Sequence, residues 1–276
     1  MLLGAHTFGF VWQHSAPAAF AAIAAAGFRH VQLMASPPHF NPWREDAART
    51  RALAGLLEAS GLSLLALDLA SSDINLASAA PEVVDFAVDA YIRTIQRAAE
   101  LGAPWMCIGS GRRHALLATA NDSLMETFRP AFARIHAEAE KRGVQLILEN
   151  HPQGLLASAV GMRDFLAQEG YSDLQVIYDV ANAVAIGEDP ATGIAALKSQ
   201  IGIVHLSDSP GGVWRHDAIG TGEIDFVGIH AALRATDYTG HVVLEILSDD
   251  AVAGLIDGVA RLTASGWDFA EGLKTT

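Results

Sequence analysis

Four short apolar segments in the second half of the chain each end in a side chain that could bind a metal or move a proton. These side chains are Glu149, Asp179, His205 and Glu245. Any one of these acids alone is equally well explained as a helix cap or an ion-pair partner. Three carboxylates and an imidazole brought together would repel one another unless protons or a cation lay between them. No Lys or Arg ends these segments, so a bound divalent cation is the simplest arrangement.

The donor types indicate which metal would bind. Three oxygen donors and one nitrogen suit Mn²⁺, Mg²⁺ or Co²⁺ better than a metal that prefers thiolates. Cys107 is the single cysteine of the chain, which excludes a structural zinc site built from cysteines. We therefore expect one divalent ion per chain, with Mn²⁺ as the first expectation and Mg²⁺, Co²⁺ or Zn²⁺ as alternatives.

Short runs rich in Val, Ile and Leu alternate along the chain with longer Ala-rich segments of helical spacing. Runs that are apolar throughout are typical of strands buried on both faces of a parallel sheet. The predicted strands are Gly4–Phe10, His30–Ala35, Ser63–Leu69, Trp105–Gly109, Val144–Glu149, Gln175–Asp179, Gly202–Ser207 and Val242–Ile246. The predicted helices are Ala16–Ala26, Glu45–Ser60, Pro81–Leu101, Leu124–Arg142, Ala159–Gln168, Pro190–Ser199, Phe226–Ala235 and Asp250–Ser265.

Eight strands alternating with eight helices predict an α/β fold, the closed (β/α)8 TIM barrel, which typically needs about 250 residues. No Gly/Ser-rich or Pro-rich linker divides the chain, so we expect residues 1–276 to form a single domain. Gly27, Gly61, Gly102 and Gly143 each stand where a helix should end. The segment Gly9–His14 is not a phosphate-binding loop, which argues against an open doubly wound sheet. Barrel active sites lie at the carboxyl ends of the strands, where the four side chains above would meet.

Composition narrows the class of protein. The chain has 18 Lys and Arg against 31 Asp and Glu, a net charge of −13, so we expect no nucleic-acid partner. No apolar run reaches the roughly 18 residues that would cross a bilayer. The start of the chain lacks the basic-then-apolar order of a secretory signal, and a lone cysteine suits a reducing compartment. We expect a cytoplasmic protein without a membrane partner; a homo-oligomer is left open.

Four sequence phrases contain the strand-end side chains described above. They are Leu148-Glu149-Asn150-His151, Asp179-x-x-Asn182, His205-Leu206-Ser207-Asp208 and Leu244-Glu245. Together and in this order, they resemble the xylose isomerase-like sugar phosphate isomerase/epimerase superfamily. The resemblance runs from about the fourth predicted strand to the last, and the first third of the chain matches only as a generic barrel. It implies that the four strand-end residues bind one divalent metal, and that Glu149 and Glu245 are also the acid/base pair on either face of the substrate.

Other positions match the superfamily more loosely. The resemblance implies substrate contacts for His151, Gln153, Asn182 and His216. Asn182 stands where ketose epimerases have His, and Gln153 stands where some epimerases have Glu. His216 is alternatively an exposed loop histidine. The segment Gly220–Phe226 is similar to a turn of the family, for which tight glycines and a helix cap at Asp225 are a sufficient structural explanation.

Several further residues each have two interpretations. The basic segment Gly109–His114 is either a solvated loop or a contact for a substrate anion. Phe8, Trp12 and Trp105 are candidates for an apolar wall against the substrate, or they are ordinary packing. Cys107 lies inside an apolar strand, so we expect it to be buried and inert. The nuclease branch of this fold needs histidines at the ends of the second to fourth strands, and they are missing here.

The chemistry implied is removal of a proton from a carbon next to a carbonyl, with the two glutamates as the proton carriers and a metal-stabilised enediolate. We expect a divalent-metal-dependent isomerase or epimerase that acts on a small-molecule carbohydrate, namely a sugar, keto-sugar or inositol derivative. One alternative is a dehydratase of the keto-inositol or dehydroshikimate type on the same site. A non-enzymatic ligand-binding barrel is disfavoured, since it would have no need for two opposed glutamates.

Overall fold

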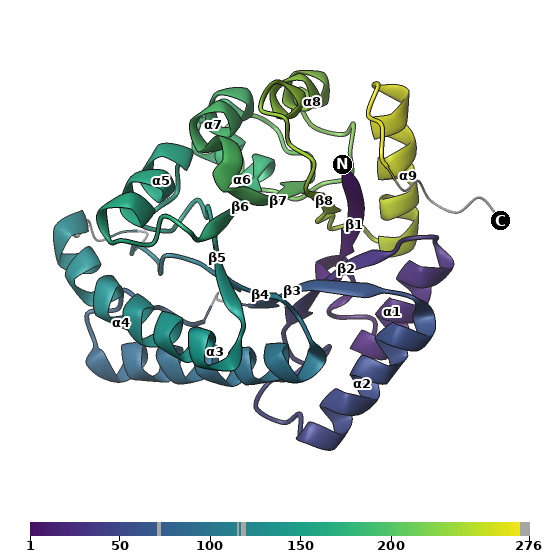
Figure 1. The fold of residues 1–276 in the computed structure, drawn as a ribbon. Helices are drawn as coiled ribbons and strands as arrows, with labels where there is room; N and C mark the ends of the chain where they lie inside the picture. The colour runs from purple at the N-terminus through teal and green to yellow at the C-terminus, as the bar shows by residue number, and fades with distance from the viewer. Residues whose placement is uncertain (71–72, 115, 117–119, 271–276) are drawn as a thin grey trace.

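Eight parallel strands close into a barrel, and the helices form a ring around it (Figure 1). The computed structural model describes residues 1–70, 73–114, 116 and 120–270. Each strand pairs with the next, and β8 closes the ring against β1. This arrangement confirms the predicted (β/α)8 TIM barrel. The strands are β1 (Leu2–His6), β2 (His30–Ala35), β3 (Ser63–Leu69), β4 (Trp105–Ile108), β5 (Gln145–Glu149), β6 (Gln175–Asp179), β7 (Ile201–Leu206) and β8 (His241–Leu244).

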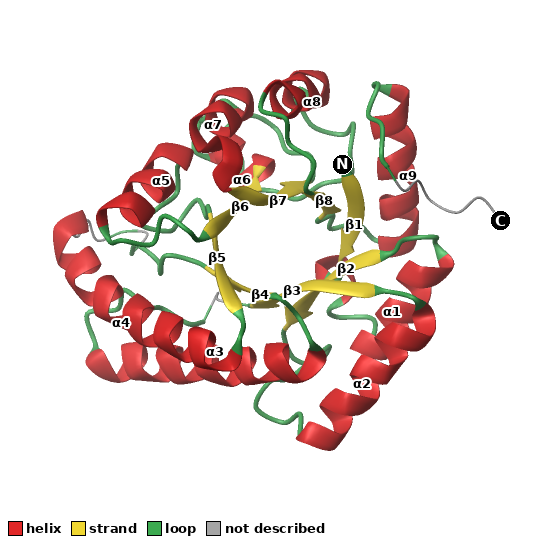
Figure 2. Ribbon diagram, in the orientation of Figure 1, coloured by secondary structure: helices red, strands yellow, loops and turns green. Residues whose placement is uncertain are grey.

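The helices cover the outer face of the strands (Figure 2). Gly61, Gly102 and Gly143 end α2, α3 and α4 in the left-handed conformation, as the sequence predicts. Within the described residues, no helix is both long and apolar enough to cross a bilayer. The helices are α1 (Ala16–Ala25), α2 (Ala47–Ser60), α3 (Pro81–Leu101), α4 (Asn121–Arg142), α5 (Ala159–Gln168), α6 (Val180–Ala185), α7 (Pro190–Leu197), α8 (Phe226–Ala235) and α9 (Ala251–Ala264), with short 3₁₀ helices at Phe8–Phe10 and Lys198–Gln200.

One strand boundary and one additional helix differ from the sequence prediction in ways that shape the site. The predicted first strand Gly4–Phe10 is too long, because β1 ends at His6 and a 3₁₀ helix follows. The backbone N–H of Phe8 donates to Nδ1 of His6 over 3.0 Å, which turns the chain there. A Cβ on Gly9 would lie 2.6 Å from the carbonyl oxygen of Ile246, so this turn packs directly against the chain after β8. The sequence also gave no sign of α6, which begins immediately after β6.

The pairing of β2 with β3 contains an irregularity. Val31 pairs with Leu64, whereas Leu33 pairs with Leu67, so β3 has one more residue than β2 over this stretch. Bulges of this kind bend a strand and re-aim its side chains, often beside active sites. The β2 residue opposite the bulge is Gln32, which is completely buried.

A small apolar cluster, separate from the core under the helices, contains residues of β3 to β8. Four of its members stand two positions before the four predicted metal ligands. Because alternate residues of a strand point to the same side, each ligand lies one layer above a cluster residue, toward the carboxyl end of the strand. The pairs are Ile147 with Glu149, Ile177 with Asp179, Ile203 with His205, and Val243 with Glu245.

Candidate metal centre and adjoining pocket

The four predicted metal ligands converge. One ligand atom from each of Glu149, Asp179, His205 and Glu245 lies within 4.8 Å of the others. Nδ1 of His205 is 3.3 Å from Oε1 of Glu149, 3.8 Å from Oδ2 of Asp179 and 3.2 Å from Oε2 of Glu245. Neighbouring parallel strands account for this, since Glu149, Asp179 and His205 belong to β5, β6 and β7 and Glu245 directly follows β8.

The donor atoms at this point fit a cation. Nδ1 of His205 and Oδ2 of Asp179 are both buried and have no hydrogen-bond partner. A buried polar atom without a partner is costly, and two facing each other among carboxylates indicate a missing positive group. Carboxylate oxygens with one imidazole suit a divalent ion such as Mn²⁺, Mg²⁺, Co²⁺ or Zn²⁺. These four residues could therefore hold one metal ion.

The electrostatics of the cluster agree with this reading. Burial alone would lower the pKa of His205, but the carboxylates of Glu245 and Glu149 raise it well above its usual value. Burial raises the pKa of Asp179 to about 7. The shift of His205 shows that the neighbouring carboxylates favour positive charge at this point. A proton and a metal ion compete for such a space, so metal affinity should fall as the pH is lowered.

A hydrogen-bond network fixes the orientation of His205. Oε1 of Gln32 lies 2.9 Å from Nε2 of His205, and the Gln32 amide nitrogen donates to Oδ2 of Asp68 over 2.7 Å. Since the carboxylate can only accept, the amide must present its oxygen to His205. Nε2 of His205 is therefore the protonated nitrogen, which leaves Nδ1 to face the carboxylates.

Asn150 locks the ends of β5 and β6 together. Its amide oxygen accepts from the backbone N–H of Asp179 over 2.8 Å, and its amide nitrogen donates to the Asp179 carbonyl over 2.9 Å. Asn182 donates to the carbonyl of Asn150 over 2.9 Å, and its own N–H donates to Oδ1 of Asp179 over 2.6 Å. Asp179 thus caps α6 with one oxygen and faces the cluster with the other.

The segment between β7 and α8 places His216 beside the cluster. Asp208 accepts from the backbone N–H groups of Gly220 and Ile224, over 2.7 and 3.2 Å. A Cβ on Gly222 would lie 2.4 Å from Oδ1 of Asp208, so only glycine fits there. Asp225 caps α8, as predicted. The turn brings Nδ1 of His216 to 3.5 Å from Glu245 and 3.7 Å from Asp179, and its side chain is buried rather than exposed.

A cavity of about 140 Å³ opens above the cluster. It is smaller than the roughly 300–1,000 Å³ of pockets for drug-sized ligands. Of the predicted substrate contacts, His151, Asn182 and His216 line it together with Glu149 and Glu245. Gln153 is not among the described lining residues; its amide oxygen accepts from Arg112. The substrate roles of all four residues remain predictions.

His151 is a neutral imidazole at the edge of this cavity. Burial lowers its pKa to about 4, with a further contribution from the charge of Arg112. Its Nδ1 accepts from the backbone N–H of Gln153 over 3.2 Å, so Nε2 carries the proton. The ring lies edge-on against Trp214, with 4.7 Å between centroids.

The apolar wall differs from the expectation. Phe8 and Trp214 line the cavity, but Trp12 is 81% exposed. Trp105 begins β4 at the opposite end of the barrel, where its indole donates to Gln145 over 3.3 Å. Neither residue is therefore among the described wall residues, and Trp105 instead packs against the interior cluster, the other interpretation that the sequence offered. The sequence did not single out Trp214 for this role.

Two further lining residues were not expected. Cys107 is buried, as predicted, but its thiol lines the cavity and donates to Oε2 of Glu149 over 3.4 Å. Asp68, on β3, also lines the cavity. The sequence signal for Asp68 was a single acid inside the otherwise apolar run Ser63–Leu69.

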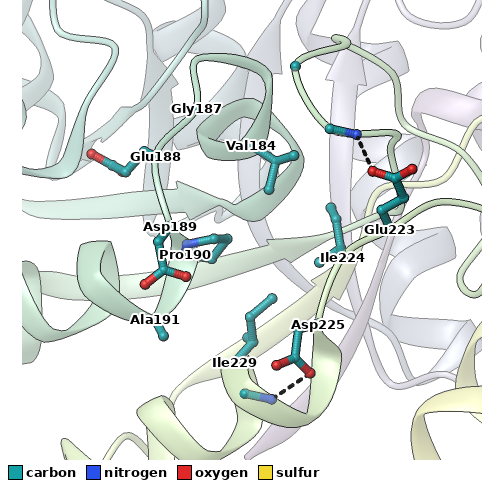
Figure 3. A pocket seen from close by; sticks show the side chains of 13 residues that line it. Val184, Gly187, Glu188, Asp189, Pro190, Ala191, Glu223, Ile224, Asp225 and Ile229 are labelled. Atoms are coloured by element: carbon teal, nitrogen blue, oxygen red, sulfur yellow. Dashed lines mark hydrogen bonds between the residues drawn. The ribbon is translucent and has the colours of Figure 1, made fainter.

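A larger hollow of about 380 Å³ lies away from the cluster, between the turn before α7 and the turn before α8 (Figure 3). Its carboxylates already have structural partners. Asp189 and Asp225 cap helices, Glu223 accepts from the N–H of Gly211, and Glu188 accepts from the hydroxyl of Tyr178. Its size therefore does not make it the better candidate site.

A family model described as xylose isomerase-like TIM barrel matches residues 20–265. The chain belongs to this family. The match covers all of the strands from β2 to β8, and so includes all four metal-ligand candidates. The resemblance predicted from the four sequence phrases is confirmed.

Solved structures share the xylose isomerase-like barrel at low sequence identity. D-psicose 3-epimerase from Clostridium cellulolyticum H10 superimposes with a TM-score of 0.80 at 19% identity, over 96% of this chain and 99% of that one. L-ribulose 3-epimerase gives 0.81 at 21% identity, over 96% and 94%. The 3-keto-D-glucoside 4-epimerase YcjR from E. coli gives 0.78 at 17% identity, over 96% and 99%. At these identities the likeness shows the fold alone.

One curated relative also matches the sequence. It is the uncharacterized protein MJ1311 of Methanocaldococcus jannaschii, 26% identical over 180 residues. The aligned part covers 63% of this chain and spans 61% of the length of that relative.

Proposed function

We propose that this chain is a divalent-metal-dependent isomerase or epimerase of a small carbohydrate, namely a sugar, keto-sugar or inositol derivative. The observation that carries the proposal is the placement of Glu149 and Glu245. Glu149 ends β5 and Glu245 directly follows β8; they approach the same nitrogen of His205 to 3.3 and 3.2 Å, and both line the cavity. Two carboxylates that flank one bound carbon could remove a proton from one face and return it at the other.

The chain's own residues divide the work. A bound divalent ion supplies Lewis-acid stabilisation of negative charge on substrate oxygens. Asp179 and His205, which are fully buried, would hold that ion. Glu149 and Glu245 would hold it too and would also carry the proton. Phe8 and Trp214 would cover the carbon chain of the substrate and exclude water from it.

The names of the structural neighbours support an epimerase over a dehydratase. The neighbours described above are a D-psicose 3-epimerase, an L-ribulose 3-epimerase and a 3-keto-D-glucoside 4-epimerase. None of these names favours the dehydratase alternative. Manganese remains our choice of metal because the donor set is dominated by oxygen.

The experiment is an assay of the Mn²⁺-loaded protein on D-psicose, D-tagatose, D-fructose and L-ribulose in deuterated water. We expect one ketose pair to interconvert, with deuterium entering at the carbon that changes configuration. Chelator treatment should abolish the reaction, and Mn²⁺ should restore it. A conjugated, ultraviolet-absorbing product would identify a dehydratase instead. Full activity after verified metal removal would contradict the proposed mechanism.

A further inference from the structure

Asp68 is a buried carboxylate in the cavity that the proposed proton transfer does not use. Its relative exposure is 5%, and it belongs to β3, across the barrel from the four metal-ligand candidates. It is not a member of the cluster that could hold the ion. Burying a carboxylate is costly unless hydrogen bonds compensate, so its partners reveal what the site is built to do.

The partners of Asp68 all meet one of its two oxygens. Oδ2 accepts from the amide nitrogen of Gln32 over 2.7 Å and from Nε2 of His6. Nδ1 of His6 accepts from the N–H of Phe8, so the proton of this imidazole is on Nε2, where it is donated to Asp68. β1 and β2 therefore fix the carboxylate from behind.

The other oxygen, Oδ1 of Asp68, is buried and has no hydrogen-bond partner. The same is true of Oδ1 of Asn182, on the other side of the cavity. Both unpaired atoms are acceptors, so a ligand that satisfies them must present donors. A sugar hydroxyl does so, whereas a fully ionised phosphate or carboxylate group has only acceptors.

The charge of the cavity leads to the same conclusion. Four carboxylates lie at or near it, those of Asp68, Glu149, Asp179 and Glu245, and a divalent ion would balance only two of them. Among the described residues, no Lys or Arg lines this cavity. A negatively charged ligand would meet a like charge at Asp68.

Arg112 lines a smaller cavity that shares the lining residue His151 with the cavity above the four ligand candidates. Its guanidinium donates to Oε1 of Gln153, and its backbone N–H donates to Asn75 over 2.8 Å. Its neighbour Arg113 is held by Asn121 and by the carbonyl of Leu155. Both arginines thus have hydrogen-bond partners in the segment after β5, and neither is among the described residues that line the cavity above the four ligand candidates.

We propose that Asp68 accepts a hydrogen bond from a substrate hydroxyl, so that the site selects an uncharged polyhydroxy ligand over its phosphate ester. This inference rests on the proposed function for the presence of a carbohydrate. It assigns Asp68 to substrate recognition, separate from metal binding and from proton transfer.

The test is equilibrium binding by calorimetry to Mn²⁺-loaded protein, with D-fructose, D-tagatose and D-psicose as probes and D-fructose 6-phosphate as their charged counterpart. We expect the wild-type protein to bind at least one free ketose 10-fold or more tightly than the phosphate. Asp68→Asn keeps an oxygen for His6 and Gln32 but turns an NH₂ group into the cavity. It should weaken ketose binding by about 10- to 100-fold and narrow the preference over the phosphate, with metal content unchanged.

Asp73→Asn is the matched control, because Asp73 is exposed and only five residues away. It should leave both affinities within 2-fold. A second measurement changes the ligand as well as the protein. One monodeoxy ketose should bind the wild-type protein about 10-fold more weakly than its parent sugar does. The same monodeoxy ketose and its parent sugar should bind Asp68→Asn equally well.

Three results would overturn the inference. They are equal ketose affinity in Asp68→Asn and Asp73→Asn, loss of metal from Asp68→Asn, and tighter binding of the phosphate that depends on Arg112, tested with Arg112→Gln. Wild-type protein that retains metal but binds no ketose of the panel would also overturn it. If ketoses bind through Asp68 but none is interconverted, the proposed function is wrong and the inference about Asp68 stands. If ketoses are interconverted and Asp68→Asn binds them as tightly as the wild type does, only the inference about Asp68 is wrong.

Discussion

The side chain of Asn150 makes two hydrogen bonds to the backbone of Asp179, one as acceptor and one as donor, over 2.8 and 2.9 Å. An amide on β5 therefore satisfies both polar groups of a residue on β6. All of these atoms belong to residues that are completely buried, where water cannot replace a lost partner. The relative position of Glu149 and Asp179 depends on this contact, because Glu149 directly precedes Asn150 in the chain and Asp179 is the residue to which Asn150 is hydrogen-bonded.

Asn150→Ala should therefore destabilise the protein strongly. Leaving two buried backbone groups without partners costs about 2–4 kcal/mol, measured as the free energy of unfolding in urea with a chelator present. Asn121→Ala is the control, since Asn121 is exposed at the start of α4; it should cost less than about 0.5 kcal/mol. Equal losses in the two variants would show that the contact has no special weight.

Gln32→Leu should lower metal affinity by about 10- to 100-fold, because nothing then orients the imidazole of His205. Competition with a chelating dye at neutral pH measures this. Gln145→Leu is a size-matched control at the opposite end of the barrel, and its affinity should equal that of the wild type. Unchanged affinity in Gln32→Leu would mean that packing alone holds His205 in place.

Glu149→Gln and Glu245→Gln should each lose most turnover, by about 10²- to 10⁴-fold, even when excess Mn²⁺ restores metal content. Asp179→Asn removes a charge but no proton carrier, so its activity should recover substantially with added Mn²⁺. The measurement is steady-state kinetics alongside elemental analysis. If Mn²⁺ rescued all three variants equally, the glutamates would be ligands only.

Acid should weaken the fold through His241. This residue begins β8, and its ring lies 4.8 Å from that of His30. Burial, with a smaller contribution from His30, lowers the pKa of His241 to about 4. In the unfolded chain His241 therefore takes up a proton as the pH falls through about 6.5, whereas in the folded chain it does so only near pH 4. Its contribution to the free energy of unfolding is complete above pH 6.5 and is lost as the pH falls toward 4.

The variant that tests this is His241→Gln, which cannot gain a charge. Because His241 is only partly buried, solvent screening reduces the effect. Between pH 7 and pH 4.5 the variant should lose about 1 kcal/mol less unfolding free energy than the wild type does, as followed by urea unfolding in chelator. His136→Gln, on the outer helix α4, should track the wild type. Parallel losses in His241→Gln and the wild type would assign the acid sensitivity to other groups.

The metal cluster could be predicted from the sequence because strand periodicity determines it. Each ligand stands two positions after an apolar residue of the barrel interior, so the side of the strand on which it lies follows from alternation. No such rule reaches the network of His6, Gln32 and Asp68. It joins three strands over separations of 62 and 36 residues, and the bulge between β2 and β3 shifts the register by one residue at that point.

The loops above the barrel were less predictable than the strands for a related reason. Trp12 and Trp214 are both exposed aromatic residues in such loops, yet only Trp214 is among the described residues that line the cavity. Asp208 accepts hydrogen bonds from the backbone N–H groups of Gly220 and Ile224, and these contacts hold the loop that places Trp214 and His216 at the cavity. Residue type alone does not record those contacts.

Asp179 serves two neighbours at once, since one oxygen caps α6 and the other faces the metal-ligand cluster. The stability of this six-residue helix and the binding of a metal ion by the cluster therefore both depend on the carboxylate of Asp179. A cation bound to Oδ2 would restrain the cap, so the amide protons of Asn182 and Ala183 should exchange with solvent more slowly in metal-loaded protein than in chelator-treated protein. Hydrogen exchange in the short helix after β6 would thus report whether the four ligand candidates hold an ion, in the absence of any substrate.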